Sequence, residues 1–352
     1  MTDRRLNVAV VGLGYWGPNR LRVLVDNDEA AVTHICDLDA ERLTRFAQRH
    51  PTTNASPHFD DLLEDDGLDA ILLATPVFTH YALAKKALEA GKHLFVEKPL
   101  AGSSCEAAKL VLLAAERELV LRCGHTFLFS PAVRAIKDLL DRGELGELYF
   151  VSSSRVNLGL HQQDMSVVWD LGPHDFSLLL YLLDQRPTWV SANGRDSIVK
   201  GVPDVAFLDL GFDSGLLANI ELSWLAPSKL RRTVIVGSEK MVLYDDSSRE
   251  PVRVFDQGVV YEDPESFGQY QLSYRTGDIV TPRIDTGEPI DLEMRAFFHD
   301  IAQFKIADRS LDIATDVVQL IESAESSMEN QGEKTVIPAS LGRERRATRA
   351  SD

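Results

Sequence analysis

The residues best placed to do chemistry follow a short apolar run at residues 94–96, where the chain reads Glu97-Lys98-Pro99. An apolar run that ends in a charged pair predicts a buried strand with a polar tip. Ligands bind at the carboxyl ends of the strands in open α/β sheets, so we expect the Lys98 ammonium to face a binding site. A solvated Glu-Lys pair at the end of an ordinary strand is the alternative interpretation.

Strand, glycine turn and helix follow one another at the start of the chain. Residues 6–11 are rich in β-branched side chains, and Gly12, Gly14 and Gly17 come directly after them. In this pattern the first glycine permits a tight turn, the second lets the backbone approach a pyrophosphate, and the third allows close packing of helix on strand. The helix that Pro18 opens presents free N–H groups to phosphate. The two aromatic residues of this turn are further candidates for cofactor contact: Tyr15 and Trp16.

A carboxylate ends the second predicted strand, residues 32–36, twenty positions beyond Gly17. In dinucleotide-binding folds such a carboxylate accepts hydrogen bonds from the adenosine ribose and repels a 2′-phosphate. Asp37 therefore predicts NAD as the cofactor rather than NADP. Asp37 or Asp39 could also simply cap the helix that follows, and the two roles are compatible.

A further strand tip carries polar residues that could line the cofactor. The strand predicted at residues 68–74 leads into Thr75 and Pro76, and a helix follows over residues 81–90. We expect Thr75 and Pro76 to lie beside the cofactor. His80 is either a cofactor contact or a packing residue near the start of that helix.

Repeated strand and helix units with short loops occupy the first third of the chain. The last of their strands is predicted at residues 119–124. Such repeats specify a doubly wound parallel sheet, so we expect a Rossmann domain of the α/β class over residues 1–125.

The rest of the chain has a different pattern. Long alternating runs between turn residues predict an α+β domain with a large, mostly antiparallel sheet over residues 126–338. Late amphipathic helices are predicted at residues 292–307 and 313–328, and either could pack on the first domain. The arginine-rich residues 339–352 have too few apolar side chains to pack and are predicted to form a disordered tail.

One stretch of the second domain combines an acid and a base four residues apart, Asp170 and His174. Gly172 and Pro173 fit the N-cap and first position of a helix, which predicts His174 in its opening turn and Asp170 in the loop before it. A histidine there stays neutral because the helix dipole opposes its charge, and a neutral imidazole can accept a proton while Asp170 orients the ring. The alternative is that His174 and Asp175 cap a buried helix.

Whole-chain composition excludes several classes of function. A net charge of −17 argues against nucleic acid and anionic membranes as partners, because both require clustered Lys and Arg. Three widely spaced cysteines without a C-x-x-C pair predict neither disulfides nor a metal site and suit a cytoplasmic protein. No apolar run approaches the ~20 residues of a membrane span.

Four features together resemble the Gfo/Idh/MocA oxidoreductases, in the same order and at similar spacing: the glycine turn, Asp37, Glu97-Lys98-Pro99, and Asp170 with His174. The resemblance covers residues 5 to about 330. It implies an NAD-dependent oxidoreductase acting on CH–OH, in which Lys98, Asp170 and His174 act in catalysis. Glu97 and Lys98 are also expected among the cofactor contacts. In such proteins the Lys-Pro peptide bond is often cis.

The expected reaction is hydride transfer from a secondary alcohol. His174 removes the hydroxyl proton as general base, and Asp170 holds the imidazole in a productive tautomer. Lys98 stabilises the developing alkoxide.

A narrower resemblance concerns residues 154–159 and 168–175. They are similar to family members that oxidise C3 of UDP-linked N-acetylhexosamines or their uronic acids, although Val156 and Gly172 depart from the usual pattern. Guanidinium groups grip phosphate and carboxylate well. The candidate substrate-binding residues are Lys98, Arg155, Asn157, Trp169, Asp170, His174 and Arg232, with Lys229 and Arg231 as further basic candidates.

Two other interpretations stay open. A free cyclitol or monosaccharide would need no phosphate grip, and a non-catalytic NAD-binding sensor would need no turnover. The expected partners are a sugar or nucleotide-sugar substrate and further copies of the chain, in a homodimer or homotetramer.

Overall fold

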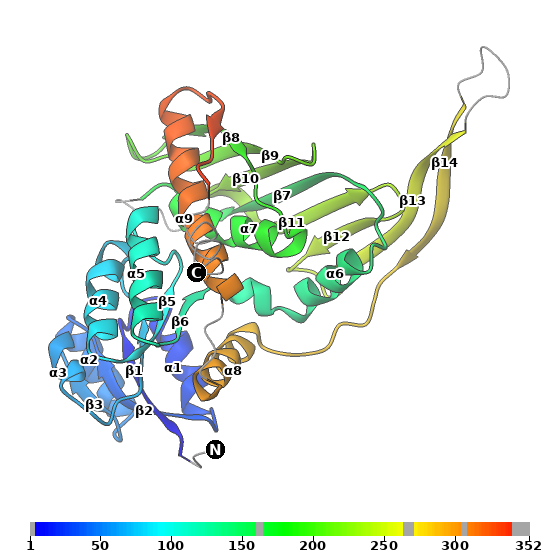
Figure 1. Ribbon diagram of the computed structural model, residues 1–352. Coiled ribbons are helices and arrows are strands. Elements are labelled where there is room, and N and C mark those ends of the chain that lie inside the picture. Colours follow the sequence, from blue (N-terminus) through cyan, green and yellow to red (C-terminus); the bar gives the residue numbers. More distant parts are fainter. Residues whose placement is uncertain (1–3, 160–164, 263–270, 304–307, 340–352) are drawn as a thin grey trace, which may run out of the picture. The chain divides into compact units, whose positions relative to one another are not determined.

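A computed structural model describes residues 4–159, 165–262, 271–303 and 308–339. The chain forms two compact units (Figure 1). The first runs to Phe129 and also takes in Gly287–Gln319, whereas the second comprises Ser130–Thr286 and Leu320–Pro338. The first stretch of this unit ends at Phe129, close to the boundary expected at residue 125, and a late segment, which the sequence allowed to pack on the first domain, belongs to the same unit.

The sheet of the first unit has six strands in the order β3-β2-β1-β4-β5-β6, and every pairing in it is parallel. The order runs outward from β1 on both sides, so the doubly wound parallel sheet is confirmed. Its strands are β1 (Leu6–Val11), β2 (Ala30–Cys36), β3 (Asn54–Ser56), β4 (Ala70–Leu73), β5 (His93–Glu97) and β6 (Leu121–Gly124).

The helices that connect these strands are α1 (Gly17–Val25), α2 (Ala40–Arg49), α3 (Phe59–Leu63), α4 (Val77–Glu89) and α5 (Ser104–Glu116). The short η1 (Thr126–Phe129) follows β6, and α8 (Pro289–Ala302) belongs to the late segment of this unit. Side chains of α8, including Met294, Phe297 and Phe298, join the apolar core formed by β1 and α1. Burial of these large apolar groups explains why a late segment of the chain folds with the first unit.

The sheet of the second unit has nine strands in the order β14-β13-β12-β11-β7-β10-β9-β8-β15. Among its pairings β7 with β10 is parallel and the others are antiparallel, so the mostly antiparallel sheet is confirmed. Its strands are β7 (Leu148–Leu158), β8 (Trp189–Arg195), β9 (Val205–Gly211), β10 (Leu217–Ser223), β11 (Leu225–Gly237), β12 (Met241–Asp245), β13 (Val252–Glu262), β14 (Gln271–Val280) and β15 (Thr335–Val336).

Two helices, α6 (Pro131–Asp141) and α7 (Val167–Leu183), lie wholly in the second unit. Residues of β9 alternate between buried and exposed, as Ala206, Leu208 and Leu210 are buried on the side that α7 contacts. β13 and β14 continue as a two-stranded ribbon beyond the end of β12 (Figure 1). The last long helix, α9 (Asp308–Glu329), contributes to both units.

The predicted start of α7 was wrong. The helix begins at Val167, where the Ser166 hydroxyl accepts hydrogen bonds from the N–H groups of Val168 and Trp169. Pro173 lies inside the helix and has no N–H to donate to the carbonyl of Trp169. A serine cap and extensive burial of the later turns outweigh the Gly-Pro signal.

Two other predictions lie partly outside the described residues. The helix expected at residues 292–307 ends at Ala302, and residues 304–307 are not described. The predicted tail falls almost wholly on residues 340–352, which also lie outside the described part. Among the helices that the structure describes, none is long and apolar enough to cross a bilayer.

Candidate active site

The glycine turn has the geometry that a dinucleotide requires. Gly12 adopts φ +87°, and a Cβ on Gly17 would lie 1.8 Å from the Gly12 carbonyl oxygen, so neither position accepts a side chain. A Cβ on Gly14 would have no neighbour within 4 Å, which leaves the backbone open to close approach. α1 starts at Gly17 and directs its N-terminal N–H groups to this turn. These residues fit the diphosphate of NAD.

The two aromatic residues of the turn differ in exposure. Tyr15 exposes 74% of its surface and stands edge-on to the half-buried Trp16, with ring centroids 5.5 Å apart. Their contact with cofactor stays a prediction.

Asp37 is buried at the tip of β2 and holds the glycine turn. Its carboxylate accepts hydrogen bonds from the backbone N–H of Leu13 at 2.6 Å and of Asp39 at 2.8 Å. Arg42 also donates to it, at 3.1 Å. The cap of α2 is Asp39, which accepts from the Arg42 N–H at 3.0 Å, so Asp37 is not used as the cap.

Thr75 and Pro76 lie at the tip of β4, against the glycine turn. A Cβ on Gly12 would meet the Thr75 side chain at 2.9 Å, and Pro76 forms the N-cap of α4. The Thr75 hydroxyl accepts a hydrogen bond from the Thr79 hydroxyl at 2.8 Å. Thr75 therefore lies next to the glycine turn within the first unit, as the sequence predicts, and Pro76 follows it.

His80 is buried between two backbone carbonyls. Its Nδ1 lies 2.9 Å from the Pro99 oxygen and its Nε2 lies 2.8 Å from the Thr75 oxygen. Burial lowers the pKa of His80, while hydrogen bonds to the two carbonyls oppose that change. Both nitrogens are turned to the chain's own backbone, so His80 ties the tip of β4 to the loop after β5. Its contact with cofactor stays a prediction.

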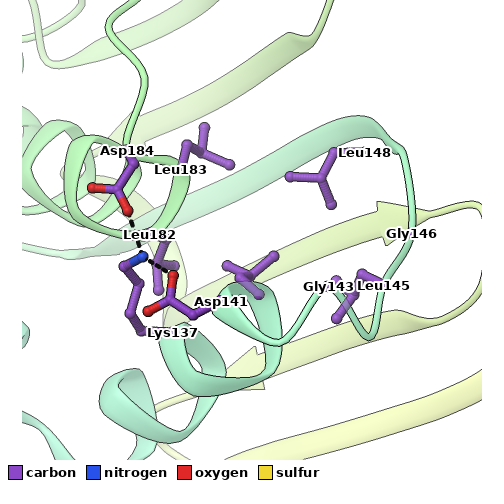
Figure 2. A pocket seen from close by; sticks show the side chains of 10 residues that line it. Lys137, Asp141, Gly143, Leu145, Gly146, Leu148, Leu182, Leu183 and Asp184 are labelled. Carbon is purple, nitrogen blue, oxygen red and sulfur yellow. Dashed lines mark hydrogen bonds and ion pairs between the residues drawn. The ribbon is translucent and has the colours of Figure 1, made fainter.

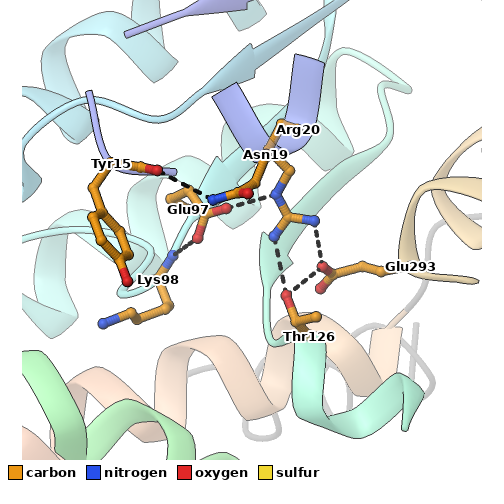
Figure 3. A network of polar contacts seen from close by, with 7 residues as sticks. All are labelled: Tyr15, Asn19, Arg20, Glu97, Lys98, Thr126 and Glu293. Carbon is orange, nitrogen blue, oxygen red and sulfur yellow. Dashed lines mark hydrogen bonds and ion pairs between the residues drawn. The ribbon is translucent and has the colours of Figure 1, made fainter. Parts of the chain in front are cut away.

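Lys98 comes directly after β5, and the peptide bond to Pro99 is cis, as the family resemblance suggested. Glu97, the last residue of β5, is buried and points inward to α1. Figure 3 shows the Lys98 side chain pointing away from this carboxylate. The structure therefore separates the two predicted cofactor contacts, since the Glu97 carboxylate binds Arg20 and the half-buried Lys98 side chain points away from it.

A buried ionic network surrounds Glu97 (Figure 3). Arg20 of α1 is 1% exposed and donates from Nε to Glu97 at 2.7 Å, from one terminal nitrogen to Glu293 of α8 at 2.7 Å, and from the other to the Thr126 hydroxyl at 3.1 Å. Thr126 donates in turn to Glu293 at 2.7 Å. One guanidinium thus joins α1, β5, η1 and α8.

His125 follows β6, the strand next to β5, and Gly124 pairs in register with Glu97. The ring is buried, and neither of its nitrogens has a hydrogen-bond partner among the described residues. Burial, and to a smaller extent the Lys98 ammonium, lower the pKa of His125 to about 3. The imidazole is therefore neutral at physiological pH.

In the second unit, Asp170 and His174 lie one turn apart on α7. Residues four apart share a helix face, so both side chains project from the same side. Trp224, a buried residue directly after β10, donates its indole N–H to Asp170 at 3.1 Å. His174 is the eighth residue of the helix, so the helix dipole, which acts within the first turn, does not explain a neutral imidazole there.

Arg155 of β7 is buried and forms an ion pair with Asp175 of α7. Asp175 also accepts from the Ser153 hydroxyl at 2.7 Å, and Ser153 lies 2.9 Å from the Thr233 hydroxyl. Asp175 is therefore a partner of the sheet and not a helix cap. This network joins α7 to β7 and β11.

The other basic candidates divide between the two faces of the sheet. Arg231 pairs in register with Arg155, and it donates to Asp246 at 3.1 Å. Arg232, the next residue, is exposed on the opposite face from α7. Lys229 is exposed as well. The structure therefore brings Arg155 and Arg231 together but does not bring Arg232 to Asp170 and His174.

The remaining two substrate candidates lie near the same helix and strand. Asn157 follows Arg155 on the same face of β7, two residues on, and is half-buried. Trp169 precedes Asp170 in the first turn of α7 and is also half-buried. Their contact with substrate stays a prediction.

Sequence reasoning missed Arg20, Glu293 and Trp224. Arg20 lies on the apolar face of α1 with Leu24, and a charge on such a face requires a buried partner, so a signal was present. Glu293 is separated from it by 273 residues, and no local pattern pairs them. For Trp224, the sequence gives no indication of a role beyond its position at the end of a predicted strand.

A separate cavity of about 150 Å³ lies in the second unit (Figure 2). Lys137 of α6 borders it and pairs there with Asp141 and Asp184. None of the predicted site residues lines it. Within the described residues, no cluster of three or more His, Cys, Asp or Glu side chains could hold a metal ion.

Several known proteins are similar to this chain. UDP-N-acetylglucosamine 3-dehydrogenase of Acidithiobacillus ferrooxidans is 28% identical over 240 residues, which cover 68% of this chain and 74% of that protein. scyllo-Inositol 2-dehydrogenase (NAD⁺) of Bacillus subtilis is 28% identical over 249 residues, which cover 67% and 73%. The crystal structure of GenD2 from gentamicin A biosynthesis in complex with NAD has a TM-score of 0.80 at 24% identity, covering 96% of this chain and 97% of that one. At that identity the likeness shows the fold alone.

Two family profiles match the chain. The oxidoreductase family with an NAD-binding Rossmann fold, Gfo/Idh/MocA, matches residues 6–125, and the Gfo/Idh/MocA C-terminal domain matches residues 133–243. Together they span more than half of the chain and cover the glycine turn, Lys98, Asp170 and His174. The chain therefore belongs to the Gfo/Idh/MocA family of NAD-dependent oxidoreductases.

Proposed function

We propose that the protein oxidises the C3 hydroxyl of a UDP-linked N-acetylhexosamine or of its uronic acid. The observation that carries the proposal is the Asp170 and His174 pair on one face of α7, with Asp170 held by the indole N–H of Trp224. A fixed carboxylate one turn from an imidazole can orient that ring for proton removal. Alcohol oxidation requires such a base.

In this mechanism bound NAD⁺ supplies the hydride acceptor. His174 takes the hydroxyl proton of the substrate, and Asp170 holds the imidazole in the tautomer that accepts it. Lys98 donates a hydrogen bond to the same oxygen and stabilises the negative charge that develops there. The carbinol carbon loses a hydride and the oxygen loses a proton, so the product is a ketone.

Two observations support a nucleotide-sugar substrate. Arg155 and Arg231 are cross-strand neighbours on the sheet face that α7 contacts, and guanidinium groups bind phosphate oxygens in a bidentate way. The relative that acts on UDP-N-acetylglucosamine is 28% identical to this chain.

A free cyclitol is the second candidate. Arg155 already forms a buried ion pair with Asp175, so its charge is compensated within the chain without a phosphate. A neutral polyol such as myo-inositol would need no further cation. The similarity to scyllo-inositol 2-dehydrogenase supports this candidate.

The test follows NADH formation by the purified protein with UDP-N-acetylglucosamine, its uronic acid and myo-inositol in parallel. A second set of reactions contains 2-oxoglutarate to reoxidise any tightly bound cofactor and is followed by mass spectrometry of the oxidised product. Turnover confined to the nucleotide sugars supports the proposal, and turnover confined to myo-inositol replaces it with the second candidate. Arg231→Met should then raise KM for a nucleotide sugar by about tenfold, the loss of one charge-assisted contact. The same substitution should leave the KM for myo-inositol unchanged.

We also propose that the chain forms a homodimer or homotetramer through the open face of the nine-stranded sheet. Phe150, Phe207 and Leu217 project from that face and expose 45%, 51% and 53% of their surface. Apolar patches of this kind mark protein interfaces. Size-exclusion chromatography with light scattering should give the mass of a dimer or tetramer. The Phe150→Glu substitution should lower the measured mass to that of the monomer.

A further inference from the structure

The starting observation is that Glu97 uses both of its carboxylate oxygens. Oε1 accepts from Arg20 Nε at 2.7 Å, and Oε2 accepts from the backbone N–H of Lys98 at 3.4 Å. The carboxylate is therefore a link between the buried guanidinium and the main chain of the residue proposed for catalysis.

The other carboxylate of the network is bound differently. Glu293 uses Oε2 alone, for both Arg20 and Thr126, and its Oε1 has no partner among the described residues. Burial raises the pKa of Glu293, although the Arg20 charge opposes that change. Arg20 thus binds two buried acids, of which only Glu97 is connected to the strand tip.

The chain on the far side of Lys98 is fixed as well. The Pro99 carbonyl lies 2.9 Å from His80 Nδ1, and His80 also reaches the Thr75 carbonyl at the tip of β4. Both chain neighbours of Lys98 are therefore anchored to buried groups. An ammonium on a flexible four-carbon stem needs this kind of anchoring, since a misplacement of about 1 Å can cost about 100-fold in rate.

We infer that Arg20 is a positioning residue for Lys98 and that it acts through Glu97. Arg20 lies on the helix whose N-terminus faces the diphosphate turn, so one side chain joins the cofactor-binding helix to the tip that carries the lysine. The inference rests on the proposed role of Lys98. The alternative is that the network only fastens α8 to the unit.

Two isosteric substitutions separate these interpretations. In Glu97→Gln, the amide oxygen of Gln accepts the hydrogen bond from Arg20, so the amide NH₂ group faces the Lys98 N–H. Two donors then face each other, and the hydrogen bond to the Lys98 backbone is lost. In Glu293→Gln, the amide oxygen replaces Oε2 and the NH₂ replaces the unpartnered Oε1, so no bond is lost. Both variants remove one carboxylate from the same guanidinium, which makes them a matched pair.

The experiment measures Lys98 directly in the full-length protein, by its rate of acetylation with a sulfo-N-hydroxysuccinimide ester and peptide mass spectrometry. We expect Glu97→Gln to change that rate severalfold and Glu293→Gln to leave it at the wild-type value. NADH affinity, followed by fluorescence, should be the same in all three proteins. Equal labelling of Lys98 in both variants and the wild type would overturn the inference.

Turnover gives the second readout, on whichever substrate of the panel the wild type oxidises. Glu97→Gln should lower kcat by about 10- to 100-fold at little change in KM, whereas Glu293→Gln should not. In a Lys98→Met background the Glu97 substitution should have no further effect, because residues that act through one another are not additive. If Lys98→Met itself retains full turnover, the proposed mechanism fails, while the labelling result still tests the link from Arg20 to Lys98.

Discussion

Two regions of the molecule hold a proposed catalytic group, and they do so with different chemistry. Next to Lys98 in the chain, Glu97 belongs to a charged network in which Arg20 joins four elements. The pairing of Arg20 with Glu293 in this network spans 273 residues of sequence. Asp170 accepts a hydrogen bond from a neutral donor, the indole N–H of Trp224, 54 residues away. A buried ionic network fixes geometry at the risk of a large penalty if one member is lost, whereas a neutral donor can be removed at the cost of one hydrogen bond.

The largest effect is expected from breaking the charged network. Arg20→Met would leave two buried acids without their cation, and we expect a loss of about 3–5 kcal/mol in the free energy of unfolding. Arg22→Met is the matched control, because Arg22 lies two residues from Arg20 on the same helix and pairs with Glu288 at the surface. Denaturant unfolding of both variants measures the difference. A loss of under about 1 kcal/mol for Arg20→Met would show that the network does not stabilise the fold.

The second prediction concerns His125, a buried side chain of the first unit that lies outside the network of Arg20, Glu97 and Glu293. The pKa of His125 is about 3 in the fold and ordinary in the unfolded chain, so the unfolded state binds more protons as the pH falls. Stability should therefore decrease by about 2 kcal/mol between about pH 8 and pH 5 on account of this residue.

His125→Phe should remove that pH dependence and leave stability at about pH 8 unchanged or higher, since neither ring nitrogen has a partner to lose among the described residues. His58→Gln, at an exposed histidine, is the control and should keep the slope. Thermal unfolding of the wild type and both variants between about pH 5 and pH 8 measures how stability changes with pH. An unchanged slope in His125→Phe would exclude this imidazole as the source.

The smallest effect is expected from the neutral donor. Trp224→Phe keeps most of the buried ring and removes the hydrogen bond to Asp170, which should lower kcat by about tenfold, or about 1.4 kcal/mol. KM should change little, because the indole contacts Asp170 in our proposal and not the substrate. Trp189→Phe is the control, since that ring packs on Gly211 and Lys334. Equal kcat in the two variants would show that the Trp224 indole does not support Asp170 in catalysis.

Local patterns were sufficient to predict the first unit. The glycine turn, the carboxylate at the end of β2 and the lysine after β5 each follow an apolar run, so their positions at strand tips could be read from the chain. The parallel sheet follows from the repeated strand and helix units. The membership of α8 in this unit could only be proposed, because it depends on packing between segments far apart in sequence.

The second unit was harder to predict, for reasons visible at single residues. Gly172 and Pro173 carry a helix-start signal, yet burial of the following turns and the Ser166 cap extend α7 through them. Arg155 and Arg232 looked alike in sequence. Strand alternation places them on opposite faces, one against Asp175 and the other in solvent.

The most direct test of the central claim is NADH formation by the wild type and by Lys98→Met, with Lys85→Met as a control at an exposed lysine. We predict that all three proteins bind NADH with similar affinity, and that the wild type and the control oxidise a nucleotide sugar. Turnover by Lys98→Met should be lower by several orders of magnitude. Wild-type turnover by Lys98→Met would contradict the proposed role of Lys98 in catalysis.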